Sequence, residues 1–180
     1  MNELYTRCLD TFPEWLRSLA TDATDLAALL EGDALDKPAK LHVAGALNYL
    51  FKSLDLIPDG IEDLGFLDDA FILRLGAKHA VDELGSASAP EALTRLAGDT
   101  AIIAELLEGT HARLVAYAKN LVTGAARGRT TQEIVEDEAS RAAFLTEVRG
   151  WAASYQAPSF ARDEKNIVKL SSFLSAKLPA

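Results

Sequence analysis

Apolar residues recur along this chain at the three- and four-residue spacing of an α-helix, so each predicted helix has one face to bury. No segment alternates polar and apolar residues for long enough to predict a strand. Gly109 is expected to interrupt the fifth predicted helix. The pattern predicts an all-α, compact multi-helix bundle with helices over residues 13–31, 38–53, 66–84, 89–98, 100–126, 131–155 and 160–178.

Capping residues mark where several of these helices are expected to begin. A capping box, Ser or Thr followed three residues later by Glu, occurs at residues 11–14, 88–91 and 130–133. Asp36 followed by Pro38 predicts a further start, because aspartate caps free backbone N–H groups and proline fits the first turn. These signals predict the N-termini of four helices.

Length and composition favour one folding unit. A chain of 180 residues, 49% of them hydrophobic, is expected to bury about 70% of the surface that the unfolded chain exposes. The most linker-like stretch is residues 85–90, but neither half beside it has an obvious core of its own. We therefore expect residues 1–180 to form a single helical domain.

Cysteine content and hydropathy bear on where the protein works. The single cysteine, Cys8, cannot form an intramolecular disulfide, and the N-terminus lacks the pattern of a secretory signal. The longest apolar stretch, residues 41–57, is interrupted by polar and charged residues and does not suit a bilayer. These features favour a cytoplasmic protein without a membrane span and leave peripheral membrane association open.

The charge balance bears on the class of partner. The formal net charge is −9, from 27 acidic and 18 basic residues. Because nucleic acids are bound through lysine and arginine, this balance argues against nucleic acid and leaves a protein partner open. A local exception is residues 119–129, where Lys119, Arg127 and Arg129 lie around two glycines and could hold an anion. The favoured alternative is that these residues end a helix.

The densest candidate chemistry lies in residues 54–69, the acidic bend, which hold six carboxylates and no basic residue. Pro58 favours an extended conformation at Ile57, and Pro58-Asp59-Gly60 is typical of a turn. We therefore expect the chain to reverse here and to form a central helical hairpin with acidic residues at its bend. The candidate binding residues are Asp55, Asp59, Glu62, Asp63, Asp68 and Asp69.

The acidic bend also carries a motif that is specific enough to suggest a family. Its residues are Asp55-Leu-Ile-Pro-Asp59, Gly65, Leu67, Asp68 and Asp69. They resemble the signature of the YkvA-like family, a bacterial domain of unknown function, over about residues 38–84. This chain departs from the family at Ser53 and Glu62, where proline is common, so its loop is less rigid. The resemblance implies a helical hairpin, sometimes in a membrane-associated setting, and it implies no activity.

Two interpretations account for the individual carboxylates, and only the first explains why so many are gathered. Ca²⁺ and Mg²⁺ take oxygen ligands, so Asp55, Asp59, Asp68 and Asp69 are candidate metal ligands, although their spacing is not that of an EF-hand. The favoured interpretation is local and needs no cofactor. In it, Asp55 and Asp59 accept backbone N–H bonds, Asp59 forms a capping pair with Glu62, and the other two charge the start of the next helix.

A third interpretation gives the acidic bend a protein partner. Apolar residues interleave with the acids and would dock a basic partner helix if they were exposed, or close the end of the bundle if they were buried. These residues are Leu56, Ile57, Ile61, Leu64 and Phe66. The sequence thus favours a non-catalytic binding or adaptor protein whose bend is mainly structural, with a divalent-cation-binding module as the alternative.

An enzyme of unrecognised type is the second alternative. The sequence contains no Gly-x-Ser-x-Gly, no glycine-rich phosphate loop and no His-Glu-x-x-His. His42, His79 and His111 lie on separate predicted helices without the spacing of metal ligands, and Cys8 is expected to be a small buried hydrophobe. No catalytic residue is therefore predicted.

Overall fold

The structure, a computed structural model, describes residues 2–180. It is 72% helical, which confirms the all-α prediction. Within the described residues the strands are confined to one short antiparallel pair, β1 (Ala125–Ala126) and β2 (Arg129–Thr130). The helices are α1 (Glu3–Glu31), α2 (Lys37–Tyr49), α3 (Leu67–Leu84), α4 (Glu91–Gly98), α5 (Thr100–Leu107), α6 (His111–Asn120), α7 (Thr131–Glu136), α8 (Glu138–Ser154) and α9 (Glu164–Lys177), with 3₁₀ turns at Glu108–Thr110 and Leu121–Thr123.

Two of the predicted helix starts are confirmed. The Asp36 carboxylate accepts the backbone N–H of Ala39 at the start of α2, and proline occupies the first turn. Thr130 and Glu133 form the complete, reciprocal capping box of α7. At both sites the local sequence signal agrees with the packing of the helix that follows.

Of the other two predicted starts, the one at Thr11 is wrong, and the one at residues 88–91 lies close to the start of α4 at Glu91 but lacks its capping box. Residue Thr11 lies inside α1, because Asn2 already caps this helix by accepting the N–H groups of Leu4 and Tyr5. Pro13 is accommodated within α1, whose apolar face is buried on both sides of the proline. The N-terminal position of α4 is occupied by Pro90, without any side-chain capping bond, so the box at residues 88–91 does not form.

Three predicted helices end or divide earlier than expected. The fifth is interrupted around Gly109, as predicted, but it stops at Asn120 and gives way to the β1–β2 hairpin. The helix predicted over residues 131–155 divides at Asp137, which caps α8. The helix predicted to reach residue 53 ends at Tyr49, because residues 50–52 turn with 3₁₀-type backbone bonds.

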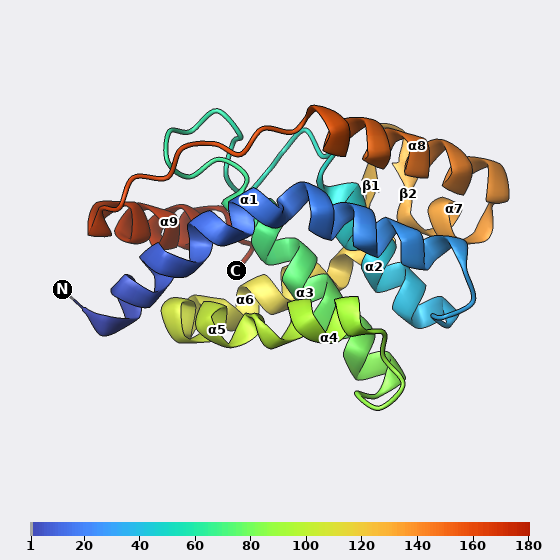
Figure 1. Cartoon of the computed structure of the whole chain (residues 1–180), viewed down its shortest axis with the longest axis horizontal. Coiled ribbons are helices and arrows are strands. Elements are labelled where there is room, and N and C mark those ends of the chain that lie inside the picture. Colours follow the sequence, from blue (N-terminus) through green and yellow to red (C-terminus); the bar gives the residue numbers. More distant parts are fainter. Residues whose placement is uncertain (1) are drawn as a thin grey trace.

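The core is built around α3, which contacts α1, α2, α4, α5 and α6. In Figure 1, α1 runs across the molecule, α4 to α6 lie on one side of it, and α7 and α8 lie on the other. Helices α2 and α3 approach closely at Gly76, where an added Cβ would come within 2.5 Å of the Ala46 Cβ. No helix among residues 2–180 is long and apolar enough to cross a membrane.

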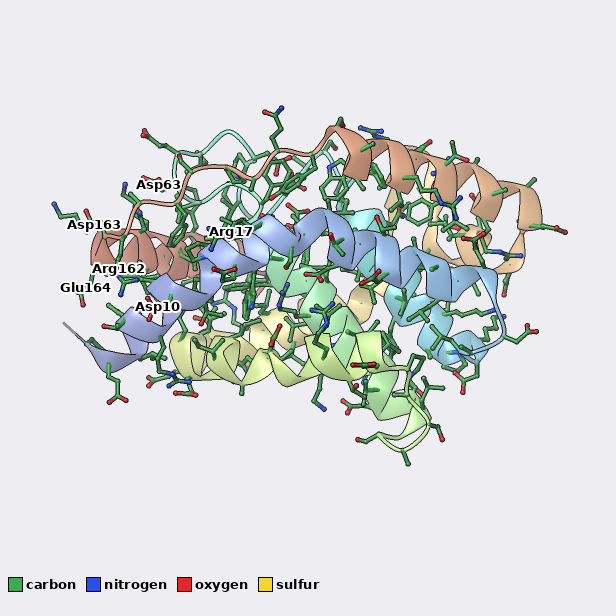
Figure 2. All side chains as sticks on the ribbon, in the orientation of Figure 1. Asp10, Arg17, Asp63, Arg162, Asp163 and Glu164 are labelled. Atoms are coloured by element: carbon green, nitrogen blue, oxygen red, sulfur yellow. The ribbon has the colours of Figure 1, made fainter. Side chains whose placement is uncertain are left out.

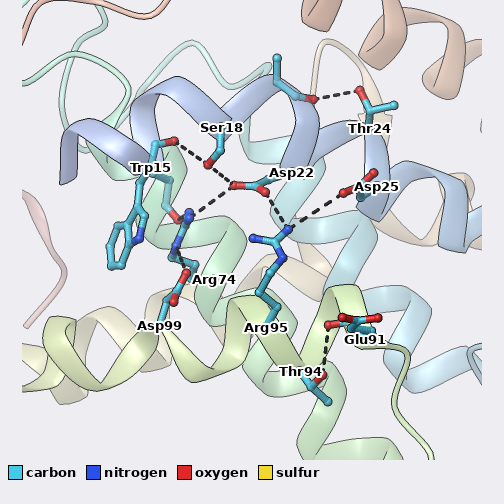
Figure 3. A network of polar contacts seen from close by, with 12 residues as sticks. Trp15, Ser18, Asp22, Thr24, Asp25, Arg74, Glu91, Thr94, Arg95 and Asp99 are labelled. Carbon is cyan, nitrogen blue, oxygen red and sulfur yellow. Dashed lines mark hydrogen bonds and ion pairs between the residues drawn. The ribbon is translucent and has the colours of Figure 1, made fainter. Parts of the chain in front are cut away.

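A buried ion network joins α1, α3 and α4 (Figure 3). The Arg74 side chain is only 1% exposed and lies 3.3 Å from Asp22 and 3.1 Å from Asp99. Its guanidinium also stacks 4.1 Å from the Trp15 ring centroid, and Arg95 reaches the same Asp22 carboxylate at 2.8 Å. Asp22 is therefore a buried carboxylate whose charge is compensated by two arginines.

Replacing Arg74 by Met is expected to lower the free energy of unfolding by about 3 kcal/mol, because it removes a buried partner of Asp22. The control is Arg17→Met, which removes an exposed ion pair with Glu14 and should change that free energy by about 0.5 kcal/mol or less. Urea unfolding of the three proteins measures both values. Equal losses in the two variants would contradict a stabilising role for the buried network.

Candidate functional site

The loop between α2 and α3 folds back on itself and returns to the start of α3. The backbone N–H of Ile61 bonds to the Pro58 carbonyl at 3.0 Å, and Asp63 and Phe66 adopt left-handed conformations. Gly65 is required by close approach, since a Cβ there would lie 2.2 Å from the carbonyl oxygen of Asp59. The predicted reversal is thus present, and it holds the Asp59 backbone against Gly65, two residues before α3.

Two carboxylates of that first turn, Asp68 and Asp69, are buried, with exposures of 0% and 2%. One oxygen of Asp68 accepts the Tyr49 hydroxyl at 2.5 Å and the backbone N–H of Ile57 at 3.2 Å. The same Tyr49 hydroxyl oxygen accepts the N–H of Leu56 at 2.7 Å. The end of α2, the loop and the start of α3 therefore meet at a single carboxylate oxygen.

The remaining oxygens of these acids are less well satisfied. One buried oxygen each of Asp55, Asp68 and Asp69 has no hydrogen-bond partner among residues 2–180. Asp59, Asp68 and Asp69 each bring one oxygen to a common place, with all three oxygens within 4.8 Å of one another. Because an unpartnered buried polar group destabilises a fold, such a cluster requires protonation or a ligand.

No basic side chain among residues 2–180 forms an ion pair with these acids, although the charge of Lys52 lowers the pKa of Asp55. Within residues 2–180, none of the ion pairs includes Asp55, Asp59, Asp68 or Asp69. Burial raises the pKa of Asp55 to about 7, and nearby carboxylates add to this effect. Burial also raises the pKa of Asp68 to about 6. It raises the pKa of Asp69 well above its usual range, and the neighbouring Asp68 is the next cause.

The local capping interpretation is not matched by the contacts of the loop acids. Among the described residues, neither Asp55 nor Asp59 accepts a backbone N–H bond, and Glu62 is exposed without a capping contact. Asp63 instead accepts the N–H of Ala161 at 2.9 Å. Figure 2 shows Asp63 beside the segment that leads into α9. Three of the six predicted acids, Asp59, Asp68 and Asp69, therefore bring an oxygen to one place. Asp55 lies near enough for the charges of Asp68 and Asp59 to raise its pKa.

The apolar residues of the acidic bend form a plug more than a docking patch. Leu56, Ile57 and Leu64 are buried, and Ile61 and Phe66 are half-buried against the core. The Phe66 ring meets the edge of the Tyr155 ring at 5.2 Å. The exposed apolar residue of this region is Leu54, at 84%.

Sequence reasoning missed two groups that the fold brings into contact. Tyr49 lies nineteen positions before Asp68 and binds it, and its place at the end of the helix before the motif was the available signal. His42 and His79 stack with ring centroids 5.2 Å apart, and burial lowers the pKa of both imidazoles. Cys8 is buried as predicted, which raises the pKa of its thiol to about 11. None of these groups adds a catalytic arrangement to the site.

The comparisons with known proteins concern this part of the chain. A family model described as "Protein of unknown function (DUF1232)" matches residues 39–75. The matched segment includes most of α2, the acidic bend and the first half of α3, and so contains Asp55, Asp59, Asp68 and Asp69. It supports an uncharacterised domain family, under a description that does not carry the YkvA-like name. No curated protein and no solved structure matches the chain.

Replacing Gly65 by Ala is expected to lower the free energy of unfolding by about 1 to 3 kcal/mol, because the new methyl group overlaps the Asp59 carbonyl. The control is Gly60→Ala, where an added Cβ meets no atom within 4 Å. Thermal unfolding of both variants is the measurement. A Gly65→Ala variant as stable as Gly60→Ala would show that Asp59 is not held by this contact.

Replacing Asp69 by Asn should stabilise the cation-free protein at neutral pH. The folded-state pKa of Asp69 is raised, so its contribution to stability is present at low pH and is lost as the pH rises and the buried carboxyl ionises. In chelator, Asp69→Asn should match the wild type below about pH 4, where Asp69 is protonated in both the folded and the unfolded state, and exceed it by about 1 to 3 kcal/mol near about pH 8. The exposed control Asp33→Asn should show no such divergence. If the free energy of unfolding of Asp69→Asn depends on pH as that of the wild type does, Asp69 does not ionise in a buried site.

Proposed function

We propose that the acidic bend binds a hard divalent cation, Mg²⁺ or Ca²⁺, which joins α2, the loop and α3. The observation that carries this proposal is the pair of buried, unpartnered oxygens of Asp68 and Asp69 beside an oxygen of Asp59. A cation supplies the compensating charge that the surrounding side chains lack.

The ligand chemistry favours a hard cation. Oxygens bound to one Mg²⁺ or Ca²⁺ at about 2.0 to 2.6 Å cannot lie more than about 4 to 5 Å apart, and the 4.8 Å limit of the Asp59, Asp68 and Asp69 oxygens satisfies this. All three donors are carboxylates, without the imidazole or thiolate that zinc prefers. Asp55 lies outside this group of three oxygens, but it carries a buried unpartnered oxygen of its own and is a further carboxylate whose pKa the Asp68 charge affects.

Tyr49 acts as a positioning residue in this proposal. Its hydroxyl donates to one oxygen of Asp68 and leaves the other oxygen to the cation. Partners of this kind orient metal ligands and tune affinity. Asp59 is exposed, so water or a further ligand can complete the coordination from the solvent side.

Cation binding would remain non-catalytic, which agrees with the class of function favoured by the sequence. A protein-docking role for the acidic bend has less support, because its apolar residues are buried or half-buried. The cluster therefore supports a cation as the ligand of the bend better than it supports a partner helix.

The test is a melting-temperature titration of the full chain with MgCl₂ or CaCl₂, against NaCl at matched ionic strength. Melting temperature should rise with the logarithm of cation concentration above saturation, and about 100 times the Kd should add about 2.7 kcal/mol to stability. The variants Asp68→Asn and Asp69→Asn should lose this response, whereas Glu62→Gln, an exposed acid of the same bend, should keep it. The same response in wild type and Asp69→Asn would overturn the proposal.

A further inference from the structure

A cleft of about 760 Å³ opens beside the acidic bend. One wall is formed by residues 50–54 and Asp59, and the other by Tyr117 and residues 125–128 of the β1–β2 hairpin. Within residues 2–180, the charged side chains of its lining are Lys52, Arg127 and Asp59. Since Asp59 is also a candidate cation ligand, Lys52 on the same wall and Arg127 on the opposite wall share this opening with a proposed cation.

The hairpin holds Arg127 in an unfavourable backbone conformation. Ala126 pairs with Arg129, so Arg127 and Gly128 form a two-residue loop in which both φ angles are positive, at 50° and 74°. Such loops strongly prefer Asn-Gly, and an arginine at the first position is strained. Strained non-glycine residues gather at functional sites. The guanidinium lies 5.0 Å from the Phe51 ring centroid, which keeps it at the α2 side of the cleft.

Tyr117 connects the cleft to the acidic cluster. Its ring packs edge-on against Tyr49 at 6.1 Å, and Tyr49 in turn donates to Asp68. Burial raises the pKa of Tyr117 to about 12, and the charges of Asp68 and Asp55 add to this. A ligand lying on Tyr117 would therefore sit within reach of the cluster.

We infer that this cleft binds a phosphate-bearing small molecule, whose phosphate group bridges the cation at Asp59 and the side chains of Lys52 and Arg127. This inference rests on the cation site proposed above. Mg²⁺ is commonly held by a few carboxylates and completed by phosphate oxygens, and guanidinium groups pair with phosphate through two N–H bonds. The chain has a net charge of −9, so two positive side chains beside a metal give this cleft a local positive potential that favours an anion. The exposed Leu54 and the Tyr117 ring supply apolar surface for the rest of the ligand.

The test is calorimetric titration of the full chain with inorganic phosphate and with phenyl phosphate, in saturating Mg²⁺ and in chelator. We expect Mg²⁺ to strengthen phosphate binding at least about tenfold and phenyl phosphate to bind more tightly than inorganic phosphate. Arg127→Asn should weaken phosphate binding at least about tenfold while keeping Mg²⁺ binding. Because Asn-Gly suits the turn, this variant should melt at or above the wild-type temperature. Lys119→Gln, an exposed lysine outside the cleft, should behave as wild type.

The outcomes separate the two proposals. If Mg²⁺ binds but Arg127→Asn leaves phosphate affinity unchanged, the cleft inference fails and the cation site stands. Equal phosphate affinity with and without Mg²⁺ would overturn the inference that phosphate bridges the cation and the basic side chains. Acetate binding as tight as that of phosphate would overturn it too. If Mg²⁺ does not bind to the wild type, the cation site fails and this inference fails with it.

Discussion

The structure of the acidic bend depends on the burial of two adjacent carboxylates without a basic partner. The contrast lies within the same molecule, where Asp22 is equally buried but pairs with Arg74 and Arg95. Asp68 has instead a hydroxyl and one backbone N–H, and its second oxygen has no partner among residues 2–180. A buried charge of this kind is unfavourable unless a proton or a cation neutralises it. The loop therefore buries negative charge that the neighbouring side chains do not neutralise by themselves.

Close helix packing makes this burial possible. Gly76 lets α3 approach α2 at Ala46, and this contact aligns the end of α2 with the start of α3. Gly45 likewise lets the Leu121 backbone approach α2, since an added Cβ at Gly45 would lie 3.0 Å from that backbone. Residue Leu121 leads into the β1–β2 hairpin, and Asn48 donates to the Arg129 carbonyl of that hairpin at 3.2 Å. Both walls of the cleft are therefore anchored to α2.

The sequence was informative where local and tertiary preferences agree. Helical periodicity predicted the all-α fold, and the Thr130 capping box and the Asp36 cap formed as expected. It failed where packing overrode a local signal, as at Thr11 inside α1. It also could not separate the acids that converge from those that do not, because Asp63 turns toward Ala161, nearly a hundred residues away. Contacts between residues so far apart in the sequence do not show in its pattern of apolar and polar positions.

Two departures from local preference lie near the cleft that Asp59 and Arg127 line. Asp68 and Asp69, which lie behind Asp59, carry buried oxygens without partners among residues 2–180. Arg127 occupies a left-handed conformation that Asn would adopt at lower cost. Each departure lowers stability, and neither is compensated within the fold. Natural proteins tolerate such violations mainly at functional sites. Asp59 belongs to the same oxygen cluster as Asp68 and Asp69 and lines the same cleft as Arg127. A cation bound to these carboxylates and bridged to an anion on Arg127 would therefore compensate both departures.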